Sequence, residues 1–306
     1  MTQATPLFER VAFIGIGLIG SSLARAIAKH GLANHIAIST RSAATLATAK
    51  ELGLGDSYSQ DPADVVADAD LVMICTPMGA YEAVAKAIAP ALKSGTIVSD
   101  VGSVKASAIN DIGPHLPDGV HLVPGHPIAG TEHSGPESGY ADLFPGHWCI
   151  LTPEPETAVQ AVDRVQALWH ACGANVEVMT PNHHDRVLAI TSHLPHLIAY
   201  TIVDTAAQLE DDTQNEVIKF SAAGFRDFTR IAASEPVMWR DVFLSNKDAV
   251  LDILGRFRED LDQMTTAIED GDGDQLEEAF SRTRAIRRGI IDLKQHIPDV
   301  KPGSDD

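Results

Sequence analysis

Positive charge is scarce in this sequence of 306 residues. Lysine and arginine together number 23 against 42 aspartates and glutamates, which gives a formal net charge of −19 at pH 7. A surface of that charge repels nucleic acid and anionic lipid, so we expect neither as a partner. An anionic small molecule would have to be bound by a local cluster of arginine or lysine side chains.

Cysteines and long apolar runs are also scarce. The three cysteines, Cys75, Cys149 and Cys172, form no C-x-x-C spacing, which argues against both a zinc site and a disulfide framework. No run of apolar residues approaches the length needed to cross a bilayer. The acidic Glu9 just before the apolar run 11–19 argues against a secretory signal. The sequence therefore predicts a protein of the reducing cytoplasm without membrane contact.

The first half of the chain alternates β-rich runs with helical patterns, and 44% of the chain is hydrophobic, enough for the cores of two domains. Strands are predicted at 11–15, 35–39, 71–75, 96–100, 121–124 and 148–152. Helical patterns lie between them, and a last helix and strand are predicted at 156–172 and 175–179. Alternation of this kind indicates a parallel sheet with helices on both faces. We therefore predict a Rossmann-type, doubly wound α/β domain over residues 1–180.

The second half of the chain changes pattern after Thr180-Pro181, where strand signals stop. Helices are predicted at about 183–209, 237–269 and 274–296. The last is expected to begin with Asp274 as N-cap and Glu277 three residues later, a capping-box pattern. Residues 181–306 are therefore predicted to form an all-α, substrate-binding domain, and helix packing of this kind favours a homodimer.

No metal site is predicted. The segment 270–274 alternates carboxylates as a calcium loop does, but the sixth loop position is Gln275 and the twelfth is Ser281, so a solvated turn fits better. His193 and His196 have a spacing that could serve a metal ion, yet no further His, Cys or Asp at a fitting spacing accompanies them.

A glycine-rich turn, Gly15-Ile-Gly17-Leu-Ile-Gly20, follows the first predicted strand and opens the first predicted helix. Gly15 permits the tight turn, Gly17 lets backbone N–H groups approach a pyrophosphate, and Gly20 allows close helix–strand packing. A phosphate would lie at the positive end of the helix dipole. The alternative is a turn that binds no ligand. The expected dinucleotide contacts are Gly15, Gly17, Leu18, Ile19, Gly20, Ser39, Thr40, Arg41, Ser42, Thr76 and Pro77.

The end of the second predicted strand bears on the choice of cofactor. An Asp or Glu at this place binds the ribose 2′-hydroxyl of NAD, whereas this chain reads Ser39-Thr-Arg41-Ser42. An arginine flanked by hydroxyls suits a 2′-phosphate, so NADP is favoured over NAD. In the alternative interpretation Arg41 stacks on the adenine and either cofactor binds.

Four blocks of the sequence carry a resemblance to a known family. They are Asp100-Val-Gly-Ser103-Val-Lys105, His126-Pro-Ile-Ala-Gly-Thr131-Glu132, Gly224-Phe-Arg-Asp227-Phe-Thr-Arg230 and Met238-Trp239-Arg240. In these blocks and their order the chain resembles the prephenate/arogenate (cyclohexadienyl) dehydrogenases from about residue 10 to residue 297. The resemblance implies oxidative decarboxylation of a cyclohexadienyl substrate in tyrosine biosynthesis, with hydride transfer to NAD(P)+.

His126 has the chemistry that such a reaction needs. It follows the predicted strand 121–124, which would place it at the carboxyl edge of a parallel sheet, where such folds present their substrates. An unperturbed imidazole titrates near neutrality and can accept a hydroxyl proton as hydride leaves the same carbon. Ser103 also follows a strand and could hold the reacting hydroxyl or orient His126. By resemblance His126 is the catalytic base and Ser103 its hydrogen-bonding partner; a structural role for a lone histidine is the alternative.

Arg230 offers the local positive charge that the acidic chain otherwise lacks, and its planar fork suits a carboxylate. By resemblance Arg230 holds the substrate; the alternative is a structural network with Asp227 and Glu235, which is more credible for Arg226. By resemblance His196 contacts the substrate, Trp239 borders it, and Thr131 and Glu132 support the pocket. His183 and His184 are predicted to be solvated residues at a helix start.

Two other functions are kept as alternatives. A β-hydroxyacid dehydrogenase would use an interdomain lysine as its acid–base group, and Lys219 and Lys247 are the only mid-helical candidates. A non-catalytic NADP-sensing protein would need the glycine turn but not Ser103, His126 and Arg230 together. Many relatives have two glycines where this chain has Ala222-Ala223-Gly224, so the choice between prephenate and arogenate is left open.

Overall fold

The structure is a computed structural model. It describes residues 5–131, 133–208 and 223–292. The contacts within the chain divide it into two units, Met1–Val250 and Leu251–Asp306. Each unit is described by itself.

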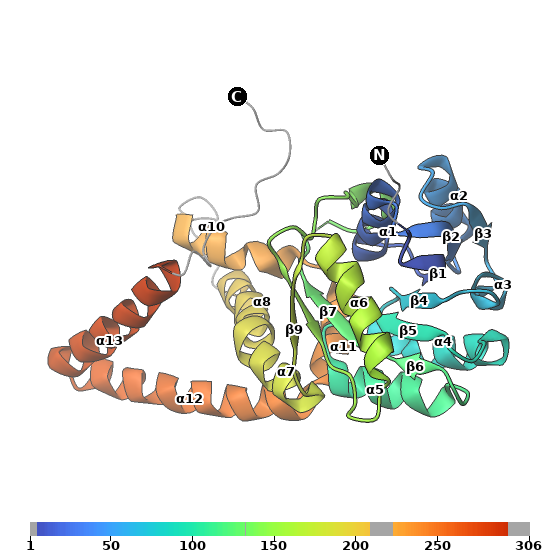
Figure 1. Ribbon diagram of the computed structural model, residues 1–306. Coiled ribbons are helices and arrows are strands. Elements are labelled where there is room, and N and C mark those ends of the chain that lie inside the picture. Colours follow the sequence, from blue (N-terminus) through green and yellow to red (C-terminus); the bar gives the residue numbers. More distant parts are fainter. Residues whose placement is uncertain (1–4, 132, 209–222, 293–306) are drawn as a thin grey trace. The chain divides into compact units, whose positions relative to one another are not determined.

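A six-stranded parallel sheet forms the centre of the first unit (Figure 1). Its order is β3-β2-β1-β4-β5-β6, and every pairing is parallel. This is the doubly wound order that the alternating pattern predicts, and the strand order reverses between β1 and β4. The strands are β1 (Phe8–Ile14), β2 (Ala33–Ser39), β3 (Ser57–Ser59), β4 (Leu71–Ile74), β5 (Ile97–Asp100) and β6 (His121–Leu122).

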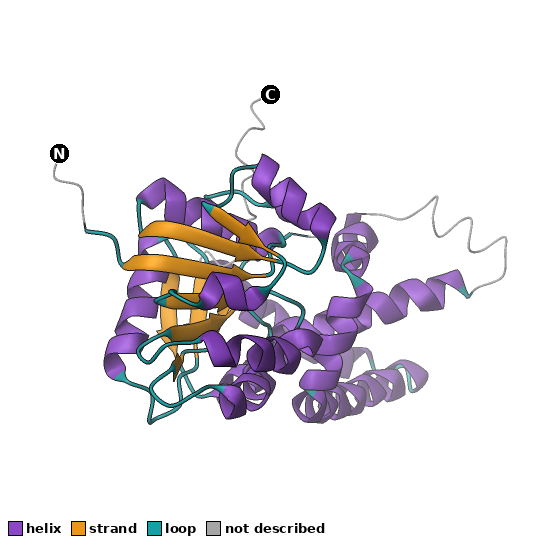
Figure 2. Ribbon diagram, turned by 90° about the vertical axis from the view of Figure 1, so that its right-hand side faces the viewer, coloured by secondary structure: helices purple, strands orange, loops and turns teal. Residues whose placement is uncertain are grey.

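Helices cover both faces of this sheet because alternate strand residues point to opposite sides (Figure 2). Val11 and Phe13 of β1 belong to one buried cluster, which includes residues of α1 and α6. Ala12 and Ile14 belong to the other, which includes residues of α3, α4, α5 and α11. The helices of this half are α1 (Leu18–His30), α2 (Ala43–Glu51), α3 (Pro62–Val66), α4 (Tyr81–Ile88), α5 (Lys105–Ile112) and α6 (Val159–Ala171). Short 3-10 turns are η1 (Met78–Ala80), η2 (Ala89–Ala91), η3 (Gly113–His115) and η4 (Pro136–Ser138).

A second sheet, not predicted from the sequence, holds the strand that carries His126. It consists of β7 (Gly125–Ile128), β8 (Trp148–Leu151) and β9 (Asn175–Val178), with β7 antiparallel and β9 parallel to β8. The chain changes sheets at Pro124: the N–H of Val123 donates to Val98 of β5, whereas the carbonyl of Pro124 accepts from Thr152. Proline has no N–H with which to continue the first ladder. The prediction that 148–152 joins the parallel sheet is therefore wrong.

One continuous helical run begins at Pro181, close to the predicted start. It consists of α7 (Pro181–Leu188), the π-helical turn η5 (Ala189–His193) and α8 (Leu194–Ala207). Contrary to the sequence-based expectation, this run is long and apolar enough to cross a membrane by length and composition alone. Core helices of soluble proteins meet the same criterion, so it does not indicate a membrane span.

The remaining helices of the described chain depart from the predicted bounds in two places. The predicted helix 237–269 is divided at Asn246, whose side chain donates to the carbonyl of Asp185. The predicted N-cap Asp274 is also wrong, because the side chain of Asp272 accepts the N–H of Gln275. The elements are α10 (Ala223–Thr229), η6 (Arg230–Ala233), α11 (Pro236–Ser245), α12 (Lys247–Glu269) and α13 (Gly273–Asp292).

Candidate active site

A cleft of about 580 Å³ lies at the carboxyl ends of β1 and β4, where the strand order reverses. Doubly wound sheets bind their ligands at this place. Eight of the predicted cofactor residues line the cleft, and Gly135 and Pro136 line it from a distant loop. The eight are Gly15, Gly17, Ser39, Thr40, Arg41, Ser42, Thr76 and Pro77.

The three glycines of the turn have the separate roles that their spacing predicts. Gly15 has φ +90°, and a Cβ there would lie 2.7 Å from the carbonyl oxygen of Cys75. A Cβ on Gly20 would lie 3.1 Å from the Cβ of Cys75, so this glycine allows α1 to pack against the end of β4. A Cβ on Gly17 would meet nothing within 4 Å. The backbone at Gly17 is therefore open to a ligand.

The start of α1 fits a pyrophosphate. Gly17 is its N-cap and gives no side-chain hydrogen bond to the first turn, so the first amides are available to an anion. Leu18 and Ile19 pack against the buried cluster beneath the helix. Together with Gly20, they do not line the cleft. Leu18, Ile19 and Gly20 can thus serve the cofactor through backbone and packing only.

The far end of the cleft has a cation and hydroxyls. Arg41 and Thr40 line it, and Ser42 caps α2 by accepting the N–H of Thr45 at 3.1 Å. Gln60 donates to the carbonyl of Arg41 at 2.8 Å and so fixes this turn. Among the described residues that line the cleft there is no Asp or Glu. This end of the cleft is therefore lined by one arginine and by hydroxyl side chains.

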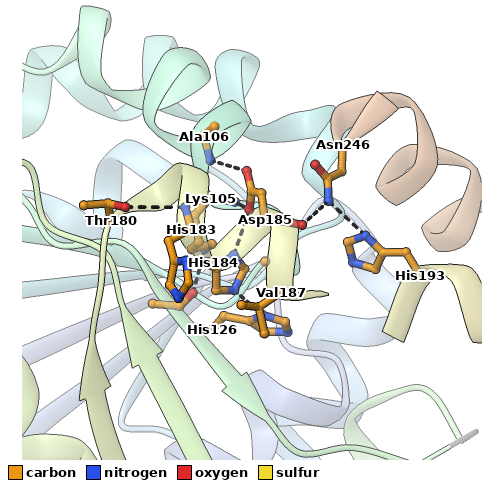
Figure 3. Close-up of polar contacts among 12 residues, drawn as sticks. Lys105, Ala106, His126, Thr180, His183, His184, Asp185, Val187, His193 and Asn246 are labelled. Atoms are coloured by element: carbon orange, nitrogen blue, oxygen red, sulfur yellow. Dashed lines mark hydrogen bonds and ion pairs between the residues drawn. The ribbon is translucent and has the colours of Figure 1, made fainter. Parts of the chain in front are cut away.

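His126 lies on β7 with 8% of its surface exposed. Its Nδ1 is 2.8 Å from Nε2 of His184 on α7, and the two rings meet edge to face. Nδ1 of His184 is in turn 2.7 Å from Oδ1 of Asp185 (Figure 3). His183 is exposed as predicted, but the prediction that His184 is solvated is wrong, because its side chain is fully buried.

Asp185 is held from three directions. Its Oδ1 accepts the N–H of Lys105 at 2.8 Å, and its Oδ2 accepts the N–H of Ala106 at 2.9 Å. The carboxylate thereby satisfies two free amides at the start of α5. The side chain of Asn246 donates to the backbone carbonyl of Asp185 at 2.8 Å and lies 3.1 Å from Nδ1 of His193. α5, α7 and the start of α12 are thus joined at one residue.

A buried ion pair lies beside His126. Nζ of Lys105 is 2.5 Å from Oδ2 of Asp100, and both side chains are fully buried. The ammonium also donates to the carbonyl of Gly125 at 2.7 Å, and the N–H of Gly125 donates to Asp100 at 3.2 Å. Tyr81 donates its hydroxyl to the same carboxylate at 3.0 Å. This pair fixes the backbone next to His126 at the carboxyl end of β5.

The surroundings keep His126 neutral. Burial lowers its pKa well below 6.5, and the charges of His184 and Lys105 lower it further. Burial also lowers the pKa of His184, but the hydrogen bond to Asp185 opposes that shift. The expectation that His126 titrates as an unperturbed imidazole near neutrality is therefore revised: it loses its charge at a lower pH.

Ser103 lies half-buried in the loop between β5 and α5. The partner of Nδ1 of His126 is His184 rather than this serine. Thr131 is half-buried and accepts the N–H of His133 at 3.3 Å. Glu132 lies outside the described residues, as does Lys219.

A second group of predicted residues comes together on α8, η6 and α11. His196 stacks on Trp239 with the ring centroids 3.6 Å apart, and its Nδ1 donates to the carbonyl of Ser192. Burial lowers the pKa of His196, and the charge of Arg230, at the start of η6 beside α8, lowers it further. His193 meets Trp239 edge to face and also contributes to the lowered pKa of His126. His193 therefore lies between the two groups.

Three residues of the site were missed by sequence reasoning: Lys105, His184 and Asp185. Lys105 stands within a block already singled out, two residues after Ser103. The consecutive His184 and Asp185 follow a proline that starts a helix, a place where polar residues are normally solvated. Only their contacts with β7 and α5 reveal their place. In the described part of the chain, no group of three or more His, Cys, Asp or Glu is arranged to hold a metal ion.

Comparison with known proteins shows the family of the chain. Residues 23–178 match the family model described as prephenate dehydrogenase, nucleotide-binding domain, and residues 180–282 match prephenate dehydrogenase, dimerization domain. A cyclohexadienyl dehydrogenase of Zymomonas mobilis is 43% identical, with 93% of this chain and 97% of the relative covered. A prephenate dehydrogenase of Bacillus subtilis is 33% identical, with 92% and 76% covered.

A solved structure is also similar over nearly the whole chain. The prephenate dehydrogenase of Aquifex aeolicus, in complex with hydroxyphenyl propionate and NAD+, superposes with a TM-score of 0.86 at 32% identity. The match covers 95% of this chain and all of that structure. On both family models and on relatives of this similarity, the chain belongs to the prephenate dehydrogenase family.

Proposed function

We propose that this chain oxidises and decarboxylates prephenate or arogenate in tyrosine biosynthesis. The observation that carries the proposal is the place of His126, which is buried on β7 beside the carboxyl end of β5 and whose pKa is lowered by burial. A neutral imidazole there can take the proton of the substrate's ring hydroxyl as hydride leaves the same carbon. Loss of carbon dioxide then makes the ring aromatic.

The other roles follow from charge and packing. Arg230 binds a carboxylate of the substrate, and the stacked pair of His196 and Trp239 borders the ring. Ser103 holds the reacting hydroxyl, since Nδ1 of His126 is already bonded to His184. Thr131 and Glu132 support the pocket. The work of these residues is chiefly orientation and removal of one proton.

A nicotinamide cofactor bound in the cleft would supply the hydride acceptor. The open backbone at Gly17 and the uncapped start of α1 would hold its pyrophosphate. We infer that NADP is preferred, because Arg41 and neighbouring hydroxyls stand where a carboxylate would select NAD. NAD remains the second candidate.

We also propose a cytoplasmic homodimer formed through the helical half of the chain, residues 181–306. The net charge of −19 supports the absence of nucleic-acid and anionic lipid partners. Light scattering during gel filtration would test the dimer; a mass of one chain at micromolar concentration would contradict it. A boundary near residue 180 between the two functional halves belongs to the same proposal.

A steady-state assay tests the activity. The purified chain is mixed with prephenate, arogenate or a panel of β-hydroxyacids, each with NADP+ or NAD+, and cofactor reduction and carbon dioxide release are followed together. We expect equal rates of both products with prephenate, arogenate or both, and none with the hydroxyacids. Reduction with a hydroxyacid, or cofactor binding without turnover of any substrate, would contradict the proposal.

A further inference from the structure

We propose that His184 and Asp185 act as positioning residues for His126: they fix which of its nitrogens is the base and take over the proton charge that the reaction delivers. The inference rests on the proposed function for the role of His126. The roles of His184 and Asp185 rest on hydrogen-bond geometry, because the three residues form one chain of contacts at 2.8 and 2.7 Å.

The direction of the hydrogen bonds follows from Asp185. Its two oxygens accept backbone N–H groups from Lys105 and Ala106, so the carboxylate acts as an acceptor. The contact at 2.7 Å with Nδ1 of His184 therefore requires His184 to donate from that nitrogen. A neutral imidazole donates from one nitrogen and accepts at the other. His184 thus accepts at Nε2.

The same argument applies to the ring of His126. Because Nε2 of His184 is an acceptor, the contact at 2.8 Å requires His126 to donate from Nδ1. The lone pair of a neutral His126 is then on Nε2. The base is therefore Nε2 of His126, the ring nitrogen that does not contact His184. The chain of contacts from His126 through His184 to Asp185 is called the relay below.

Proton transfer through the relay balances. The substrate hydroxyl gives its proton to Nε2 of His126, and His126 gives its Nδ1 proton to Nε2 of His184. His126 ends neutral, and His184 becomes an imidazolium whose Nδ1–H faces the carboxylate of Asp185. The electron pair leaves the substrate with the hydride, so the relay residues are neither oxidised nor reduced.

The charges around the relay favour this direction. Lys105 disfavours positive charge on both rings, but its ammonium is paired with Asp100 at 2.5 Å. Asp185 and Asp100 raise the pKa of His184, whereas His184 and His193 lower that of His126. His193 is turned to Asn246 and takes no part in the chain of contacts. Of the two rings, His184 is therefore the better place for the proton.

Two substitutions of His184 separate orientation from charge transfer. The amide oxygen of His184→Gln can accept the Nδ1–H of His126 but cannot be protonated, whereas His184→Leu does neither. We expect kcat to fall about tenfold in the first and about a hundredfold in the second, with substrate KM changed less than about threefold. His183→Gln, an exposed neighbour on the same turn, is the control and should keep wild-type kcat.

The pH profile distinguishes a relay from a structural contact. A proton on His184 makes its Nε2 a donor and so forces His126 into the tautomer with no lone pair on Nε2. The acidic limb of kcat/KM in the wild type therefore reports His184. In His184→Gln only the more strongly depressed His126 remains, so the limb should move to lower pH. A limb that stays in place, or a His184→Leu enzyme with more than about half of wild-type kcat, would overturn the relay.

Nitrogen-15 NMR of the histidine rings in the resting enzyme tests the tautomer without turnover. The signals of His126 are assigned by their loss in His126→Asn. We expect Nδ1 to carry the proton and Nε2 the lone pair; the reverse would overturn the proposal even if His184→Leu fails to fold. This measurement stands apart from the proposed function, which fails instead if the wild type turns over neither prephenate nor arogenate.

Discussion

The cofactor cleft and the acid–base centre are built in different ways. The cleft depends on backbone: a glycine with φ +90°, an open glycine and the start of α1, all within six consecutive residues. The acid–base centre depends on side chains from β5, β7, α5 and α7, joined by contacts such as that between His126 and His184, 58 residues apart. A local motif therefore identifies the first site, whereas only the fold reveals how the second is connected.

The acid–base centre should give the largest loss when one side chain is changed. His126→Asn removes the base but keeps a side chain that can hydrogen-bond the substrate hydroxyl. We expect kcat to fall by about 10² to 10⁴, with the KM of the substrate affected less. Steady-state kinetics at saturating cofactor measure both. Retention of more than about a tenth of wild-type kcat would mean that the base lies elsewhere.

Loss of the substrate anchor Arg230 should have the next largest effect. Arg230→Ala should lose about 2–4 kcal/mol in kcat/KM because the charge-assisted fork to a carboxylate disappears, while cofactor binding is unchanged. Arg226→Ala, four residues earlier, is the matched control and should lose much less. Equal losses in both variants, or unfolding of the first, would place Arg230 in a structural network.

Cofactor binding in the cleft should be weakened by a single methyl group added at Gly17. Gly17→Ala places a Cβ where nothing lies within 4 Å, so the fold should be unaffected while the cofactor KM rises about tenfold or more. Gly20→Ala places its Cβ 3.1 Å from Cys75 and should lower the melting temperature as well. A Gly17→Ala enzyme with normal KM for the cofactor would show that the pyrophosphate does not lie on this turn.

Cofactor choice should depend on one cation at the edge of the cleft. Arg41→Ala is expected to raise the KM for NADP at least tenfold, about 1.4 kcal/mol, because the 2′-phosphate loses its partner. The KM for NAD should change little. If both cofactors weaken equally, Arg41 is a platform for the adenine and the preference for NADP is wrong.

The sequence predicts the part of the fold whose signals are local. The apolar runs of β1, β2, β4 and β5 and the turn from Gly15 to Gly20 are each contained in a few consecutive residues. β3 is only three residues long and carries no such signal. β7 escapes prediction because Gly125-His-Pro-Ile reads as a continuation of β6, and only pairing with β8 separates the two.

The candidate site also contains residues that a local sequence pattern reveals and residues that only the fold reveals. His126, Arg230, His196 and Trp239 were found because they stand in recognisable blocks. His184 and Asp185 were missed because their burial comes from α5 and β7, about 80 and 60 residues away in the chain. The N-cap of α13 was placed two residues too late, since Asp272 and Asp274 carry the same side chain and only geometry tells them apart.

The most direct test of the account is the pH dependence of kcat/KM for the wild type and for His126→Asn. Burial lowers the pKa of both His126 and His184 from 6.5, and His126 can act as the base through Nε2 only while both rings are neutral. The wild-type rate should therefore rise with pH along a limb below 6.5 and stay level above it. The limb should vanish in His126→Asn along with most of the activity. A variant that keeps the limb would contradict the central claim, and His196 would be the next residue to test.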